Sequence, residues 1–169
     1  MHFIFDFNMA KHSPTSFKIK YVHGNQNLID EIEVLWESLN QLMCERSIYF
    51  KQHFFGMTFE KRKVELLEKV SSGEIHIDLA VDEVTGNSVG YVVSSIDSKK
   101  TGVIESVYVS EVYRGFGLGD RLMRNALSWL DEKNALVKVL DVTVGNEAVY
   151  SFYCRYGFLP RQTQLKQVK

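Results

Sequence analysis

The sequence predicts one mixed α/β (α+β) domain in which helices flank a mostly antiparallel central sheet. Two early segments carry apolar residues at helical spacing, and three later segments alternate apolar and polar residues. A glycine-rich turn then separates a strand-like segment from a helical one. The 169 residues, 45% of them hydrophobic, suffice for one domain with a substantial core. We therefore assign residues 17–169 to a single domain and residues 1–16 to an N-terminal tail.

The first half of the chain predicts one strand and two helices. Its helical segments repeat leucine, isoleucine and valine every three or four residues, and a threonine stands where a helix cap is expected. The predicted elements are a strand at 17–22, a turn at 23–25, a helix at 28–43, and a helix from a cap at Thr58 to about Val70. Residues 45–55 are rich in aromatic side chains and predict no single structure.

The second half predicts a meander of three strands, followed by alternating helices and strands. Polar turns separate the three meander segments, whose apolar residues have a period of two. The predicted elements are strands at 75–81, 88–96, 103–109 and 136–144, helices at 120–131 and 146–156, and an edge strand at 158–168. Because a helix joins the strand at 136–144 to the strand before it, we expect these two strands to be parallel.

The turn before the helix at 120–131 reads Arg114-Gly115-Phe116-Gly117-Leu118-Gly119. Three glycines leave little side chain there, so backbone N–H groups can converge at the positive end of the helix dipole. Such a turn is sized for phosphate, and the arginine adds a cation at its edge. An ordinary turn is the alternative, because glycine is common in turns.

Two widespread phosphate-binding patterns do not fit this turn. A P-loop needs Lys followed by Ser or Thr after its last glycine, whereas Asp120 and Arg121 follow here. A dinucleotide-binding turn needs a sixth-position glycine within a βαβ unit, and Asp120 occupies that position. The sequence therefore argues against a nucleoside triphosphate or NAD as the ligand of this turn. The remaining candidate is a diphosphate that backbone amides bind without metal-ligating side chains.

Composition narrows the partners and the compartment. A net charge of −1 gives no reason to expect a nucleic acid or a membrane as partner. Cys44 and Cys154 are too few for a disulfide framework, so we expect a cytoplasmic protein. The first ten residues lack the basic start of a signal peptide, and no segment approaches the ~18 apolar residues of a membrane span. The five histidines stand at no metal-ligand spacing, so we predict no metal site.

The order strand, two helices, three strands, loop, helix, strand, helix, strand carries Arg-Gly-x-Gly-x-Gly after its fourth strand. A second motif combines Asn146-Glu147 with Phe152-Tyr153 and Gly157-Phe158. Over residues 17–168 the chain resembles the GNAT-type N-acetyltransferase superfamily, and residues 105–119 are particularly similar to its spermidine/spermine N-acetyltransferase branch. Ser110-Glu111 departs from the family, which often has a proline there. The N-terminal half of the chain, which forms the acceptor pocket in this family, carries no motif that we can assign.

The resemblance implies that acetyl-CoA binds as co-substrate in a wedge where the fourth and fifth strands splay apart. The backbone of three strand residues would pair with the pantetheine arm, and the glycine turn would hold the pyrophosphate. The implied cofactor-binding residues are Val107, Tyr108, Val109, Arg114, Gly115, Phe116, Gly117, Leu118, Gly119, Asp120 and Asn146. Asn146 caps a helix, contacts the CoA arm, or does both.

Glu105 and Tyr153 are the candidate catalytic residues. Transfer to an alkyl amine, whose pKa is about 10, requires loss of a proton. Glu105 could take that proton directly or through water, attract a cationic substrate, or be a solvated residue or ion-pair partner. Tyr153 could protonate the leaving thiolate, or be a core tyrosine.

The favoured function is acetyl-CoA-dependent N-acetyltransferase, with direct transfer to a primary amine of a small molecule such as a polyamine. An aminoglycoside or a protein amine stays open as acceptor, and a homodimer stays open as assembly. A non-catalytic acyl-CoA-binding or sensing module is the alternative on the same fold. A third reading is an interaction protein that uses the aromatic residues between Tyr49 and Phe59. Those residues are also where we expect a wall of the acceptor pocket.

Overall fold

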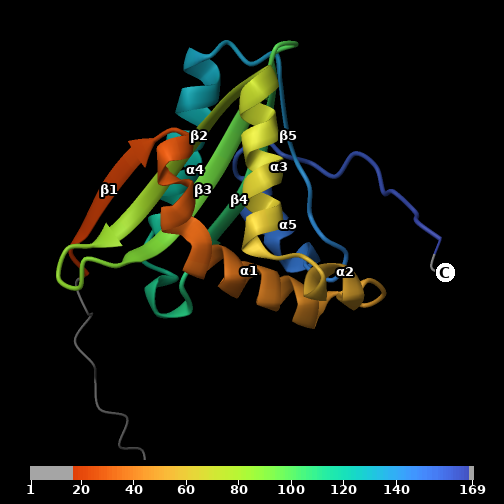
Figure 1. The fold of residues 1–169 in the computed structure, drawn as a ribbon, viewed down its shortest axis with the longest axis horizontal. Coiled ribbons are helices and arrows are strands. Elements are labelled where there is room, and N and C mark those ends of the chain that lie inside the picture. Colours follow the sequence, from red (N-terminus) through yellow and green to blue (C-terminus); the bar gives the residue numbers. More distant parts are fainter. Residues whose placement is uncertain (1–16, 168–169) are drawn as a thin grey trace, which may run out of the picture.

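The computed structural model describes residues 17–167, so the tail predicted at residues 1–16 lies outside the described chain. Its centre is a five-stranded sheet in the order β1-β2-β3-β4-β5 (Figure 1). The strands are β1 (Ile19–Gly24), β2 (Gly73–Asp82), β3 (Ser88–Asp97), β4 (Thr101–Val109) and β5 (Val137–Leu140). Neighbours pair antiparallel except β4 and β5, which are parallel as expected. The predicted fold class is confirmed.

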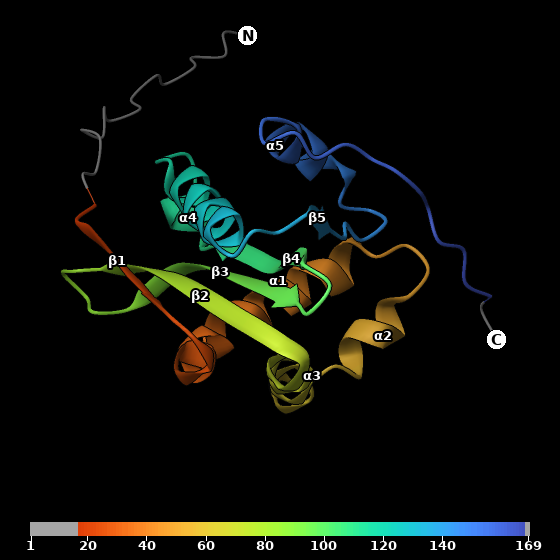
Figure 2. The same cartoon turned by 90° about the horizontal axis from the view of Figure 1, so that it is seen from above.

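Helices lie on both faces of this sheet. Figure 2 shows α1 and α3 on one face and α4 with α5 on the other. The α-helices are α1 (Glu33–Arg46), α2 (Lys51–Phe55), α3 (Phe59–Ser72), α4 (Leu118–Glu132) and α5 (Tyr150–Cys154). Short 3₁₀ segments are η1 (Gln26–Ile32), η2 (Glu111–Tyr113) and η3 (Glu147–Val149). Thr58 caps α3 as predicted, because its Oγ1 accepts the N–H of Lys61 at 3.4 Å.

Several predicted boundaries were wrong. The first strand continues through Gly24, and the helix expected at 28–43 begins as the 3₁₀ segment η1. The strand expected at 136–144 pairs only from Val137 to Leu140. No strand forms at 158–167, the described part of the predicted edge strand. Pro160 has no N–H for a ladder, and the polar residues around it gain little from burial.

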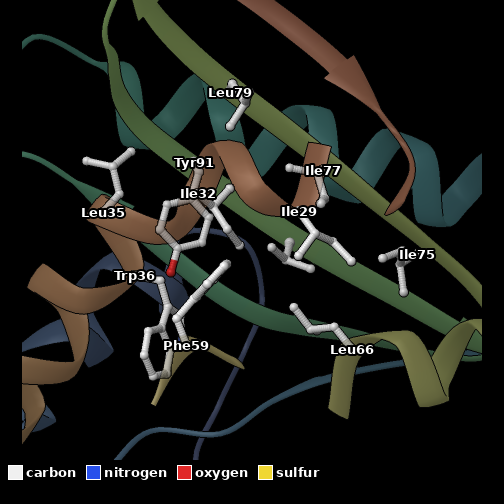
Figure 3. Close-up of a cluster of buried hydrophobic side chains, with 11 residues drawn as sticks. Ile29, Ile32, Leu35, Trp36, Phe59, Leu66, Ile75, Ile77, Leu79 and Tyr91 are labelled. Atoms are coloured by element: carbon white, nitrogen blue, oxygen red, sulfur yellow. The ribbon is translucent and has the colours of Figure 1, made fainter. Parts of the chain in front are cut away.

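The two faces of the sheet bury separate hydrophobic clusters. One joins α1, α3 and the sheet, and Tyr91 lies fully buried within it (Figure 3). The other joins α4 to the opposite face and includes Leu122, Met123 and Leu130, none of which is exposed. These clusters fix α1 and α4 against the sheet, so the segments that connect them to β4 are held in place.

A β-bulge interrupts β4 at Glu105. Val93 of β3 is opposite Ser106, and Ser94 is opposite Ile104, so Glu105 is an extra residue in β4. β5 pairs with β4 only from Thr101 to Ile104, before the bulge. Bulges bend a strand and end its pairing. The residues of β4 beyond the bulge therefore part from β5, which is the splay expected between the fourth and fifth strands.

Candidate active site

A cleft of about 950 Å³ opens where β4 and β5 part. Its walls come from α1, α2, α3, the far end of β4, the glycine turn, the segment after β5, and α5. It is lined by almost every residue singled out from the sequence: Glu105, Val107, Tyr108, Val109, Arg114, Gly115, Gly117, Leu118, Gly119, Asp120, Asn146 and Tyr153. Phe116 is the exception, because its half-exposed ring packs edge-on against Phe17, with ring centroids 5.0 Å apart.

The glycine turn has the backbone geometry of an anion site. Gly115 and Gly117 have φ angles of +84° and +82°, which side chains with a Cβ adopt only with strain. Gly117 directly precedes the 15-residue helix α4. In the described chain, the N–H groups of residues 115–120 donate to no backbone carbonyl. These donors therefore remain available at the positive end of a long helix.

Arg114 supplies the cation that was expected beside this turn. Its Nε donates to the carbonyl of Val109 at 2.9 Å, and its guanidinium lies 5.4 Å from the centre of the Tyr108 ring. Tyr113, next to it, donates its hydroxyl to Asp82 Oδ2 at 2.7 Å. The turn is thus tied to β4 on one side and to the end of β2 on the other.

Asp120 would repel a phosphate if its charge were unpaired. The Tyr156 hydroxyl donates to Asp120 Oδ1, and Arg155 Nη1 lies 3.2 Å from the same oxygen. The hydrogen bond from Tyr156 lowers the pKa of Asp120, and the charge of Arg155 adds to this effect. Burial and the bond to Asp120 raise the pKa of Tyr156 to about 12. Asp120 is therefore an ionised carboxylate whose charge is offset locally.

Glu105 is a buried carboxylate surrounded by donors. Its Oε2 accepts from Arg62 Nη2 at 3.1 Å, and its Oε1 accepts from Ser95 Oγ at 2.5 Å and lies 2.7 Å from Lys69 Nζ. The side chain is 6% exposed. Burial by itself would raise the pKa of Glu105, but the bonds from Lys69 and Ser95, with the charges of Lys69 and Arg62, outweigh burial and lower it. Glu105 is therefore ionised and fully engaged.

Tyr153 lines the cleft from α5. Its ring packs edge-on against Phe152, with centroids 5.3 Å apart, and against Phe158 at 6.5 Å. Burial raises the pKa of the Tyr153 phenol above its ordinary value. The hydroxyl therefore keeps its proton at neutral pH, in a ring whose position is fixed by its aromatic neighbours.

Asn146 closes one end of the cleft against α1. Its Oδ1 accepts a hydrogen bond from Arg46 Nη1, and both residues line the cleft. It precedes η3 but makes no side-chain cap there. The neighbouring Gly145 has a φ of +99°, and a Cβ on it would lie 2.2 Å from the carbonyl oxygen of Arg46. Glycine at 145 thus lets the end of α1 approach the turn after β5.

Sequence reasoning missed the cationic partners of Glu105 and the residue opposite Asn146. Arg62 and Lys69 are seven residues apart, which places them on one face of a helix. That spacing was the available signal, although it does not say which carboxylate the face meets. For Arg46 no signal in the sequence connects it to a turn 100 residues later.

The described residues contain no group of three or more His, Cys, Asp or Glu side chains arranged to hold a metal ion. Over the same stretch, no helix combines the length and the apolar character needed to cross a membrane. The site is therefore described by its backbone donors, its paired charges and one phenol.

A family model described as the acetyltransferase (GNAT) family matches residues 36–158. That match covers most of the chain, and the chain belongs to this family. An uncharacterised N-acetyltransferase of Methanocaldococcus jannaschii is 31% identical over 84 residues, a match that covers 46% of this chain. The match spans only 37% of the length of that relative.

Solved structures share the fold over nearly the whole chain. An acetyl transferase from Pyrococcus furiosus gives a TM-score of 0.65 at 24% identity, covering 89% of this chain and 100% of that one. PaiA N-acetyltransferase from Thermoplasma acidophilum, solved in complex with coenzyme A, gives a TM-score of 0.65 at 21% identity, covering 87% of this chain and 93% of that one. At these identities the likeness concerns the fold.

Proposed function

We propose that this chain transfers the acetyl group of acetyl-CoA to a primary amine of a small molecule. The observation that carries the proposal is the cleft at the splayed strands, with free amides at one end and a phenol along its wall. Amides of residues 115–120 hold the pyrophosphate, with Arg114 at their edge. The backbone beyond the bulge, Val107 to Val109, pairs with β3 but has no partner strand on the β5 side, where it can pair with the pantetheine arm.

The transfer needs one bond to form and one to break. The amine nitrogen attacks the thioester carbonyl carbon, the carbon–sulfur bond breaks, and the leaving sulfur takes a proton. The phenol of Tyr153 is the proposed source of that proton, because burial keeps it protonated at neutral pH. The proton that the amine loses goes to solvent through the open side of the cleft.

For Glu105, the contacts favour an electrostatic role over the role of base. Both of its oxygens already accept bonds, and its pKa is lowered, so its affinity for a further proton is poor. We propose that Glu105 holds the guanidinium of Arg62 in position, and that Arg62 in turn pairs with Glu65 at the cleft.

We propose a homodimer in the cytoplasm, with one domain over residues 17–169, and the spermidine/spermine branch stays a prediction. A polyamine, an aminoglycoside and a protein amine are the acceptors to compare. A non-catalytic acyl-CoA-binding module remains the second candidate, since the same free amides would serve it.

An acetylation assay with a panel of amines, read by the release of free thiol from acetyl-CoA, tests the activity. Turnover with at least one amine supports the proposal. A melting temperature raised by acetyl-CoA without turnover on any amine favours the binding module. The absence of any acetyl-CoA-induced shift refutes the cofactor site itself.

A further inference from the structure

Glu65 offers a carboxylate oxygen inside the cleft. It lies on α3, three residues after Arg62, and lines the cleft with it. Its Oε2 is 3.1 Å from Arg62 Nη1, and its side chain is 43% exposed. Among the described residues, its other oxygen has no hydrogen-bond or ion-pair partner within range. That oxygen is available to a donor that enters the cleft.

A buried ion pair holds this carboxylate in place. Arg62 uses Nη1 for Glu65 and Nη2 for Glu105, each at 3.1 Å. The side chains of Arg62 and Glu105 are only 16% and 6% exposed. Because a guanidinium presents its donors in a rigid plane, fixing one end to Glu105 fixes the direction of the other. Arg62 therefore holds the Glu65 side chain in a defined position, and Glu65 is not a loosely solvated residue.

The helices α1 and α2 bring a set of apolar side chains to the cleft, together with the polar Asn40, Arg46 and His53. The apolar wall consists of Leu39, Leu42 and Met43 of α1, Phe54 of α2, and Met57. Asn40 ties these elements together, since its Nδ2 donates to the carbonyl of Phe54 at 3.0 Å and to that of Met57 at 3.3 Å. The wall is thus a fixed surface that suits an aliphatic or aromatic group.

Ser106 of β4 contributes a hydroxyl to the cleft next to the buried Tyr91. Tyr91 is fully buried and its hydroxyl lies near that of Ser106, which lines the cleft, although the pair does not reach ordinary hydrogen-bond geometry. Figure 3 shows the Tyr91 hydroxyl on the side of Trp36, another residue of the cleft wall. Burial raises the pKa of Tyr91 and an interaction with the Ser106 hydroxyl opposes that effect, so the two hydroxyls are neighbours. Ser106 therefore adds one polar group to the cleft beside the apolar side chains.

We propose that Glu65, the apolar wall of α1 and α2, and the Ser106 hydroxyl form the acceptor subsite, and that the acceptor is a single primary amine carried on an apolar group. Glu65 attracts the ammonium, and the wall takes the apolar group. This inference rests on the proposed function, because the subsite lies in the same cleft as the acetyl-CoA site.

A polyamine fits this subsite less well. Two other carboxylates of the cleft are engaged: Glu105 by Arg62 and Lys69, and Asp120 by Arg155 and Tyr156. Asp141, on the segment after β5, also lines the cleft, is exposed, and has no ion-pair partner among the described residues. A second ammonium of a polyamine that lay against the apolar wall would have no partner there, and burying an unpaired charge is costly. Among the described residues of the subsite itself, Glu65 is the one carboxylate with a free oxygen, which favours one ammonium there.

The test is isothermal titration calorimetry of the protein saturated with CoA, which allows binding without transfer. The probes are 2-phenylethylamine, its uncharged counterpart 2-phenylethanol, and spermidine. The variants are Glu65→Gln and a matched control, Glu68→Gln, which lies exposed on the same helix outside the cleft. We expect 2-phenylethylamine to bind more tightly than spermidine. Glu65→Gln should weaken the amine about fivefold and leave the alcohol unchanged, since a part-exposed charge pair contributes modestly.

Several outcomes would overturn the subsite. These are equal affinity of Glu65→Gln and wild type for 2-phenylethylamine, equal loss for amine and alcohol, the same loss in Glu68→Gln, or tighter binding of spermidine. Selective amine binding that depends on Glu65, together with no release of free thiol from acetyl-CoA, would support the subsite and refute the transferase proposal. The experiment thus separates failure of the acceptor subsite from failure of the transferase proposal.

Discussion

Replacing Glu105 by glutamine should destabilise the fold by about 2 kcal/mol. Breaking a buried ion pair from one side typically costs about 3–5 kcal/mol, because the remaining charges lose their partner. Here Arg62 keeps its bond to Glu65, and Lys69 is 41% exposed and can rehydrate. Both facts reduce the cost to about that of one hydrogen bond to a charged group. For a chain of this length, about 2 kcal/mol corresponds to a melting temperature lower by roughly 4–8 °C.

The same prediction has a defined dependence on pH. The pKa of Glu105 is lowered in the folded protein, so its ionised form stabilises the fold above the unfolded pKa of about 4.3. That contribution is lost as pH falls through the lowered folded pKa. The difference in melting temperature between wild type and Glu105→Gln should therefore be full at pH 7 and should shrink progressively below about pH 4.

Thermal unfolding followed by circular dichroism from pH 7 down to pH 3 measures this difference. Glu68→Gln is the control, since that exposed residue should show no gap at any pH. A gap that is absent at pH 7, or one that is the same size at pH 3, would refute the buried ion-pair reasoning. In the amine assay, Glu105→Gln should also raise the KM for the amine more than it weakens acetyl-CoA binding.

Three further substitutions test the rest of the site. Gly117→Glu places a negative charge where phosphate is expected, and it should remove the acetyl-CoA-induced rise in melting temperature, which corresponds to about 2.7 kcal/mol at 100 times the Kd. Tyr153→Phe keeps the ring packing and should lower turnover by about 10²–10⁴ with stability and CoA affinity near wild type, if the phenol is the acid. Gly145→Ala should cost at least about 2 kcal/mol, because its Cβ would meet the Arg46 carbonyl at 2.2 Å and its φ is +99°.

For each of the three substitutions, one result would contradict the prediction. A wild-type response of Gly117→Glu to acetyl-CoA would mean that the turn does not hold the pyrophosphate. A loss of less than about threefold in Tyr153→Phe would return that residue to a packing role. Gly115→Ala is the control for Gly145→Ala, because it shares a positive φ of +84° but has open space around its Cβ. Equal destabilisation in both would show that the approach of α1 contributes nothing.

Local patterns predicted much of this fold, because they act within one element. The period-two alternation gave the three meander strands within about two residues, and Thr58 caps α3 as expected. The strand predicted at 158–168 was wrong over its described part, residues 158–167. A few scattered apolar residues there do not outweigh Pro160 and the polar residues around it. Residue patterns within one segment do not distinguish an edge strand from an exposed tail.

The site was predictable where one segment builds it and not where several segments meet. The glycine turn could be recognised because its donors, its arginine and the helix that follows are contiguous. The surroundings of Glu105 could not, because Ser95, Arg62 and Lys69 come from β3 and α3. The bulge was hidden as well, since an extra residue is defined only by the register of two paired strands.

One residue of β4 determines both the opening in the sheet and the way the opening is braced. As a backbone unit, Glu105 is the surplus residue that turns β4 away from β5. As a side chain, it ties α3 to the strand that has just lost its neighbour. Substitution and deletion at this position are therefore different perturbations. A substitution loosens the brace and leaves the opening, whereas a deletion would restore an uninterrupted ladder and let β5 continue along β4. One extra residue in β4, between β3 and β5, thus marks the point where the sheet opens into the cleft.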